Sequence, residues 1–111
     1  MRKFAIPLEN GRLCSHFGHC KQFALIDVKE NTITSQEFLT PPPHEPGVLP
    51  AWLAEKGVTH IIAAGIGQRA IHLFTQHNIE VCVGAESDLP EHIVQNYLDK
   101  TLETNDNLCD H

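Results

Sequence analysis

The chain has 111 residues and a hydrophobic content of 41%, so it is long enough for one globular domain and too short for two ordinary ones. Its formal net charge of −6 and its 8 scattered basic residues argue against binding to the phosphate backbone of nucleic acids, which needs clustered Lys and Arg. No apolar segment approaches the roughly 20 residues of a membrane-spanning helix, and polar residues from Glu9 onwards interrupt the apolar region that a signal peptide needs.

The N-terminal part of the chain predicts three antiparallel strands with short connections. Apolar residues alternate with others in 3–8, and they run almost without interruption through 23–28, as in a central strand. A third strand is predicted at 32–39. The segment 9–12 predicts a tight turn because its Asn-Gly pair tolerates a positive φ, and 29–31 predicts a hairpin turn.

The prolines of 40–47 break this pattern, since consecutive prolines exclude both a helix and the interior of a sheet. A helix is expected to follow and to end at Gly57. A buried strand is predicted at 58–64, parallel to the first strand of the chain. The turn 65–67 then leads into a second helix, and another strand is predicted at 79–83.

Asp88 and Glu91 predict a capping box at the start of a last helix. The order of elements is therefore β-β-β-α-β-α-β-α, which predicts an α/β fold with a mixed five-stranded sheet flanked by helices. This domain is expected to span residues 1–102. The polar residues 103–111 are expected to form a flexible tail.

The absence of an apolar leader predicts a cytoplasmic protein. In the cytoplasm, the four cysteines are expected to be reduced thiols rather than a disulfide framework. Cys82, inside the predicted strand 79–83, is expected to be a small core residue. The presence of eight histidines beside these cysteines favours metal chemistry.

The stretch Cys14-Ser15-His16-Phe17-Gly18-His19-Cys20 holds two thiols and two imidazoles, the side chains that bind soft and borderline metals. It lies between two predicted strands, so a sheet would present it as a loop, a common place for a binding site. Its spacing is neither C-x-x-C nor H-E-x-x-H. The spacing alone therefore leaves a ligand site and an ordinary loop equally open.

Three other sites compete with a metal loop. Gly65-Ile66-Gly67-Gln68-Arg69-Ala70 satisfies G-x-G-x-x-(G/A) between a strand and a helix, where a small anion or a nucleotide could bind. A dinucleotide fold needs more parallel strands, however, and the glycines could simply permit a tight turn. Catalysis by Cys14 or Cys20 lacks a recognisable signature. A carboxylate–metal nuclease would have only Glu9 and Asp27 as obvious ligands.

A longer set of residues resembles one protein family. Ser15-His16-Phe17-Gly18, followed by Phe23, is similar to the S-x-H-F-G…F signature of the dinitrogenase iron–molybdenum cofactor-binding family, which includes NifX, NifY and the C-terminal part of NifB. The similarity continues through His44-x-x-Gly47, 55–58, 61–70 and 78–81. It covers nearly the whole chain, and the small stand-alone bacterial and archaeal members form the most similar subgroup.

This resemblance implies a ribonuclease H-like fold and the non-enzymatic binding, storage or transfer of an iron–sulfur or molybdenum–iron–sulfur cluster. It makes His16 the cluster ligand, with Phe17 and Gly18 shaping the loop around it. The implied partner is a metallocofactor assembly or acceptor protein, and a homodimer is compatible with this role.

Some positions depart from the family pattern. His19 and Cys20 stand where many members have other residues, and Cys14 lies outside the shared pattern. These departures leave open whether the cargo is an iron–molybdenum cofactor, an iron–sulfur cluster, or a single zinc or iron ion. The chain ends in Cys109 and His111, loosely similar to the histidine-rich tails of some relatives. The candidate cofactor-binding residues are His16, Phe17, Gly18, His19, Cys20, His44, Gly65 and Gly67, and the candidate metal ligands are Cys14, His16, His19, Cys20, Cys109 and His111.

Overall fold

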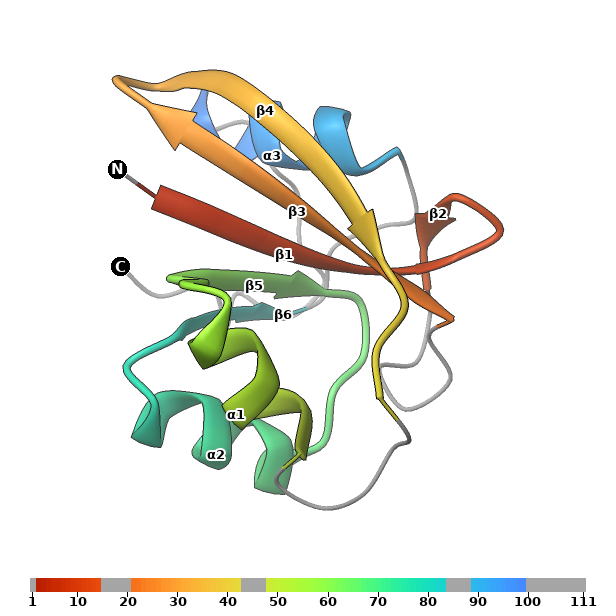
Figure 1. The fold of residues 1–111 in the computed structure, drawn as a ribbon, viewed down its shortest axis with the longest axis vertical. Coiled ribbons are helices and arrows are strands. Elements are labelled where there is room, and N and C mark those ends of the chain that lie inside the picture. Colours follow the sequence, from red (N-terminus) through yellow and green to blue (C-terminus); the bar gives the residue numbers. More distant parts are fainter. Residues whose placement is uncertain (1, 15–20, 43–47, 84–88, 100–111) are drawn as a thin grey trace.

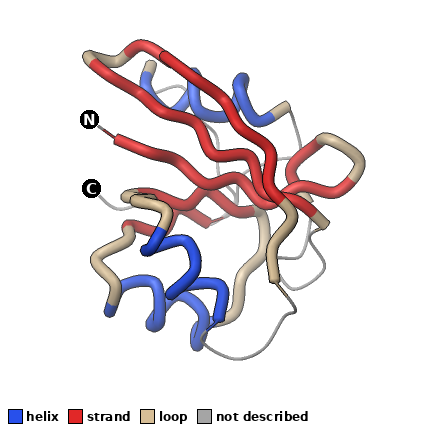
Figure 2. Tube along the Cα trace, in the orientation of Figure 1, coloured by secondary structure: helices blue, strands red, loops and turns tan. Residues whose placement is uncertain are grey.

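The computed structural model describes residues 2–14, 21–42, 48–83 and 89–99, which form a mixed sheet with helices on both faces (Figures 1 and 2). In this part of the chain the sheet has six strands: β1 (Arg2–Glu9), β2 (Arg12–Leu13), β3 (Gln22–Lys29), β4 (Thr32–Leu39), β5 (His60–Ala63) and β6 (Glu80–Val83). The helices are α1 (Val48–Glu55), α2 (Gln68–Gln76) and α3 (Pro90–Leu98).

Strand β1 lies in the middle of the sheet, whose order is β4-β3-β1-β5-β6. On one side, β1, β3 and β4 pair antiparallel. On the other side, β5 pairs parallel with β1, and β6 pairs parallel with β5. Figure 1 shows α1 and α2 on one face of the sheet and α3 on the other.

The predicted order of elements is confirmed, including the antiparallel first part and the strand parallel to β1. The predicted five strands become six, because residues 12–13 pair with the end of β1 and form β2. Both predicted turns are confirmed as well, with φ of 57° and 81° at Asn10 and Gly11 and of 53° and 62° at Glu30 and Asn31. The assignment to ribonuclease H-like folds stays a prediction.

Two hydrophobic cores lie on the two faces of the sheet, because alternate residues of a strand point to opposite faces. Phe4, Ile6 and Leu8 of β1 belong to the core under α3, together with Ile93 and Val94 of that helix. The opposite core is covered by α1 and α2 and contains Ala5, Cys14, Phe23, Leu25, Leu49, Leu53, Val58, Ile61, Phe74 and Ile79.

The ends of the helices follow local sequence signals, with one correction. Gly57, with φ of 85°, ends α1 as predicted, and the amide of Val58 donates to the carbonyl of Leu53 over 3.1 Å. The predicted capping box is wrong, since Leu89 is the N-cap of α3 and makes no side-chain cap hydrogen bond. Glu91 therefore lies one position too early for the box, and Asp88 is outside the described residues. None of the described helices has the length and hydrophobicity to cross a membrane.

Candidate functional site

Most of the predicted binding residues belong to connections that meet the sheet at one edge. The strands β1, β4, β5 and β6 all end at this edge, and β3 begins there (Figure 1). In sequence, 15–20 connect β2 to β3, 43–47 connect β4 to α1, and 65–67 connect β5 to α2. Open α/β sheets bind their ligands outside the carboxyl ends of the strands. We call this side of the sheet the carboxyl edge.

Strand β1 anchors both ends of the cysteine–histidine stretch. The amide of Cys14 donates to the carbonyl of Pro7 over 2.9 Å, and the amide of Lys21 donates to the carbonyl of Leu8 over 2.8 Å. Two neighbouring carbonyls near the end of β1 therefore fix where the stretch leaves the sheet and where it returns. The candidates His16, Phe17, Gly18, His19, Cys20, His44, Cys109 and His111 lie outside the described residues, and their roles stay predictions.

Cys14 is the one candidate metal ligand within the described residues. It is a thiol, and only 2% of the residue is exposed. Its surroundings are the apolar side chains of the core under α1 and α2. This position favours packing over metal binding, because a buried cysteine behaves as a small hydrophobic residue. Among the described residues, no three His, Cys, Asp or Glu side chains come together as a metal site.

Gly67 is the N-cap of α2 and lies exposed at the carboxyl edge. Its backbone is extended, with φ of −74° and ψ of 155°, and no side chain caps the helix. A Cβ at this position would meet no atom within 4 Å. Neither a positive φ nor close packing therefore requires this glycine, so the tight-turn explanation does not hold for Gly67. Gly65, the other glycine of the motif, lies in the bend that follows β5.

Cys82 corrects the expectation of reduced cysteines. It is buried in the core under α3, with 4% exposed, which confirms its predicted place. It is disulfide-bonded, however.

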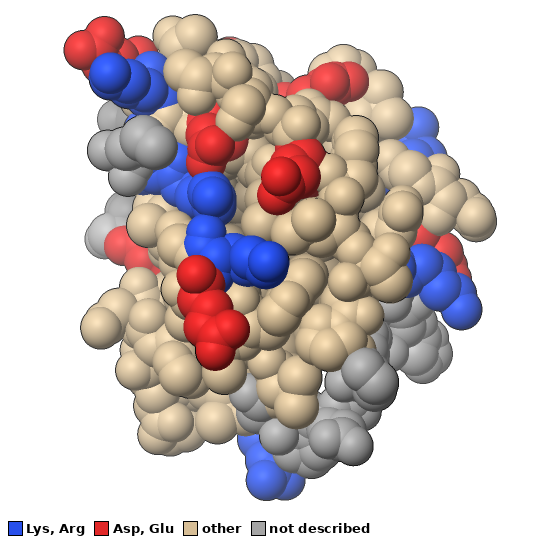
Figure 3. All heavy atoms as spheres, viewed as in Figure 1, with Lys and Arg blue, Asp and Glu red and all other residues tan. Residues whose placement is uncertain are grey.

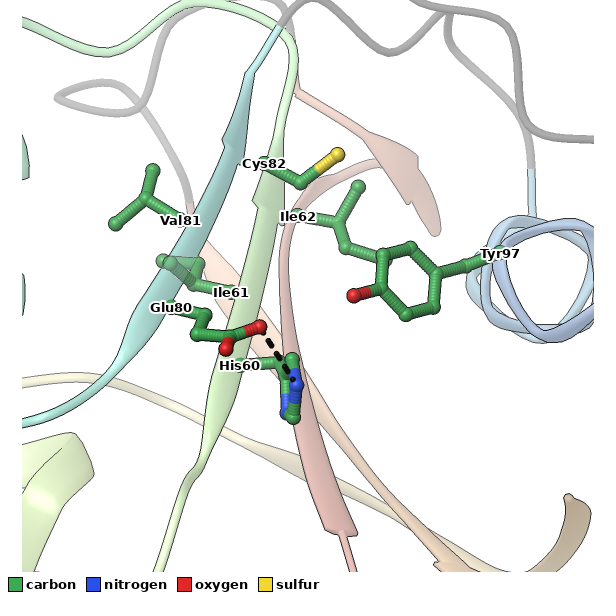
Figure 4. Close-up of a pocket in the computed structure, with 7 residues that line it drawn as sticks. All are labelled: His60, Ile61, Ile62, Glu80, Val81, Cys82 and Tyr97. Atoms are coloured by element: carbon green, nitrogen blue, oxygen red, sulfur yellow. Dashed lines mark ion pairs between the residues drawn. The ribbon is translucent and has the colours of Figure 1, made fainter. Parts of the chain in front are cut away.

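The opposite, amino edge of the sheet carries a polar cluster that the sequence did not predict (Figure 4). His60 Nε2 lies 3.1 Å from Glu80 Oε2, and His60 Nδ1 lies 2.7 Å from Thr59 Oγ1. The imidazole stacks on Phe4, with ring centroids 4.8 Å apart, and Tyr97 meets it edge-on at 6.0 Å. A small pocket with room for about one water molecule lies here. It is lined by His60, Ile61, Ile62, Glu80, Val81, Cys82 and Tyr97.

Burial controls the acid–base properties of this cluster. It lowers the pKa of His60 below the ordinary 6.5, an effect that Glu80 opposes and Arg2 strengthens. Burial also raises the pKa of Tyr97 above 10.0, with a further contribution from Glu80. The cluster forms because His60 and Glu80 are paired in register at the starts of β5 and β6. The sequence did not predict this pair, because polar residues are common at the starts of strands and the register of β5 and β6 cannot be read from them.

The surface carries charges of both signs. Figure 3 shows Lys and Arg side chains next to Asp and Glu side chains on the face in view. One such pair joins Lys3 Nζ and Asp27 Oδ1, 3.7 Å apart, at paired positions of β1 and β3. Phe38 on β4 is the large hydrophobic side chain most exposed in the described part of the chain, at 52%.

Comparisons with known proteins extend over almost the whole chain. Residues 1–100 match the model of a family described as "Dinitrogenase iron-molybdenum cofactor". The chain is 31% identical to the uncharacterized protein MJ0580 of Methanocaldococcus jannaschii over 108 residues, which cover 93% of this chain and 91% of that protein. The crystal structure of PH0822 superposes with a TM-score of 0.87 at 25% identity, covering 95% of this chain and 96% of the other. The apo form of the orange protein from Desulfovibrio gigas has the same fold, with a TM-score of 0.78 at 21% identity, covering 96% and 94% of the two chains.

Proposed function

Because this chain belongs to the dinitrogenase iron-molybdenum cofactor family, we propose that it binds a metal–sulfur cluster as cargo and passes it to another protein. The cargo is an iron–sulfur or iron–molybdenum-type cluster, or a single metal ion such as zinc. The receiver is a metallocofactor assembly or acceptor protein, and the chain itself catalyses no reaction. The observation that carries this proposal is the anchoring of the cysteine–histidine stretch at the carboxyl edge.

The chemistry of the donors fits such a cargo. Imidazole and thiolate groups bind zinc, iron and iron–sulfur clusters, and the stretch 15–20, with its cysteine reduced, offers two imidazoles and one thiol. In this proposal His16 is the principal ligand, and His19 and Cys20 are its neighbours. Phe17 and Gly18 shape the loop.

Other segments complete the proposed site. In this proposal the connection between β4 and α1 supplies His44, and the turn at Gly65 and Gly67 presents backbone N–H groups at the start of α2. Cys109 and His111 reach the site from the C-terminal tail and leave it when an acceptor takes the cargo. Cys14 fixes the start of the loop by its backbone and packs its thiol into the core.

A transfer role suits a site with few ligands. A closed cage of four cysteines holds a metal permanently, whereas an open site on a loop leaves positions that an acceptor can attack. Two imidazoles and one thiolate, assisted by a displaceable tail, bind a cluster and still release it.

Anaerobic loading tests the ligand assignment. The protein is incubated with iron and sulfide, and separately with zinc, and the bound Fe, Mo, Zn and Cu are measured together with the visible absorption spectrum. His16→Ala should lose most of the bound metal. His77→Ala is the matched control, because His77 is an exposed imidazole at the C-cap of α2. Equal loading of the two variants would show that His16 is not a ligand.

The uncapped N-terminus of α2 favours a second candidate function, the binding of a small anion or nucleotide at 65–70. Calorimetry with ATP, NAD and inorganic phosphate separates the two functions. A micromolar affinity that Gly67→Val abolishes would favour the anion site. A metal-loading defect in His16→Ala with no anion binding would favour the cargo site.

A further inference from the structure

The His60 cluster at the amino edge is separate from the proposed cargo site, and its hydrogen bonds determine which nitrogen of His60 is protonated. The imidazole has Phe4 stacked on its ring and Tyr97 at its side, and 14% of the side chain is exposed. Glu80 is the partner of one of its nitrogens, as Figure 4 shows. The hydroxyl of Thr59 is the partner of the other. Which nitrogen carries the hydrogen therefore depends on whether each partner donates or accepts a hydrogen bond.

Glu80 determines that Nε2 of His60 carries a hydrogen. Its side chain is 59% exposed, and a carboxylate can only accept hydrogen bonds. Nε2 of His60, 3.1 Å from Glu80 Oε2, must then carry a hydrogen. In the neutral imidazole this leaves Nδ1 as an acceptor, and the group 2.7 Å from it is the hydroxyl of Thr59.

The Thr59 hydroxyl has two acceptors within reach. It accepts a hydrogen bond from the amide of Lys3 over 3.0 Å, which leaves its own hydrogen to be donated. That hydrogen can point at His60 Nδ1, 2.7 Å away, or at the carbonyl of Lys3, 3.2 Å away. A hydroxyl hydrogen rotates to suit its surroundings, so both arrangements use the same heavy-atom positions.

We propose that Thr59, His60 and Glu80 form a proton-responsive hydrogen-bond switch that links β1, β5 and β6, in which the Thr59 hydroxyl changes its acceptor when His60 takes up a proton. In the neutral state, Thr59 donates to His60 Nδ1 and His60 Nε2 donates to Glu80. On acidification a proton from water bonds to Nδ1. The Nδ1–H group then donates to Thr59 Oγ1, and the Thr59 hydroxyl turns to donate to the carbonyl of Lys3.

No hydrogen bond between the strands is lost in this exchange. The Thr59–His60 bond reverses its direction, and the Thr59 hydroxyl gains a bond to the carbonyl of Lys3. The strands therefore remain paired in both protonation states. The switch changes the charge at the amino edge of the sheet without requiring the backbone to move.

The groups that face His60 decide how readily it takes up the proton. Glu80 on β6 favours the charged ring, and Arg2 on β1 opposes it. Tyr97 on α3 and Phe4 on β1 cover the ring and keep water away from it. Burial is the largest of these influences and lowers the pKa of His60. The midpoint of the switch therefore lies below the ordinary pKa of a histidine.

The first test measures the tautomer of His60 by ¹⁵N NMR of the imidazole nitrogens at neutral pH. The proposal requires a hydrogen on Nε2 and a bare Nδ1. A hydrogen on Nδ1 would mean that Thr59 already accepts from His60, and the proposal would be overturned.

The second test follows the titration of His60 in three variants. Thr59→Val removes the partner of Nδ1 in both states, and the protonated state loses more because a hydrogen bond from a charged ring is stronger than one to a neutral ring. The titration midpoint should therefore fall by about one pH unit, a tenfold loss of proton affinity. Thr59→Ser keeps a hydroxyl and should restore the wild-type midpoint. Thr75→Val is the matched control, because Thr75 donates to the carbonyl of Ile71 within α2, away from His60.

An unchanged midpoint in Thr59→Val, or the same fall in Thr75→Val, would contradict the switch. Amide spectra of each variant establish that it is folded before the titration is interpreted. Should Thr59→Val fail to fold, the tautomer of the wild-type protein decides the question by itself.

Discussion

Replacing Cys14 with alanine should lower the free energy of unfolding by about 1 kcal/mol and leave metal loading unchanged. The magnitude follows from burial, since only 2% of the residue is exposed and it lies among apolar side chains. Deleting the sulfur removes roughly the burial of one methylene group, about 0.8 kcal/mol, and a small cavity adds to this cost. Cys14→Ser should cost more, because the core then holds a hydroxyl in place of a weakly polar thiol.

Urea unfolding of the metal-free variants, followed by circular dichroism, measures the change in stability. Anaerobic loading of the same preparations measures the metal bound per chain. Cys14→Ala should show lower stability with full loading. The opposite result, wild-type stability of the metal-free protein with lost loading, would refute this prediction and would make Cys14 a ligand.

Three further outcomes follow from the structure. Gly67→Ser should stabilise the protein by a few tenths of a kcal/mol, because it supplies the side-chain cap that α2 lacks; a lower thermal midpoint would contradict this. Because burial lowers the pKa of His60 in the folded state, the unfolded state binds that proton more tightly. The free energy of unfolding should therefore fall as the pH drops below about 6.5, and it should fall less steeply in His60→Gln. Urea titrations at several pH values measure both slopes. Removing residues 108–111 deletes two proposed ligands and should speed the loss of metal to a chelator; equal rates of release would remove Cys109 and His111 from the site.

Hydrophobic periodicity was sufficient to predict the order of the elements. The alternation at Phe4, Ile6 and Leu8 places these side chains in one core. Asn10-Gly11 predicts a turn and Gly57 predicts a helix end, and the positive φ angles of these residues confirm both predictions. Two features escaped this reasoning. The pairing of residues 12–13 with β1 is too short to leave a periodic pattern. The start of α3 is displaced by one residue from the expected cap.

The candidate site was predictable only as a position in the chain. The predicted strands on either side of 15–20 indicated that this stretch connects two strands of the sheet. The hydrogen bonds that Cys14 and Lys21 donate to β1 hold its two ends against the sheet. Residue type could not reveal that Cys14 is buried, because burial depends on how α1 and α2 cover the sheet. The His60–Glu80 pair was equally invisible, since residues twenty positions apart meet only through the register of β5 and β6.

Paramagnetic NMR tests most directly whether the cargo binds at the carboxyl edge. A ¹⁵N-labelled protein is loaded anaerobically with a paramagnetic iron–sulfur cluster, and the broadening of each amide signal is measured. At about 3.3 Å per residue, Lys3 and Leu8 lie roughly 16 Å apart along β1, far enough to separate the two edges of the sheet. If the cargo binds at the carboxyl edge, the signals of Leu8, Lys21 and Gly67 broaden while those of Lys3, Thr59 and Glu80 persist. Broadening confined to the amino edge would contradict binding at the carboxyl edge.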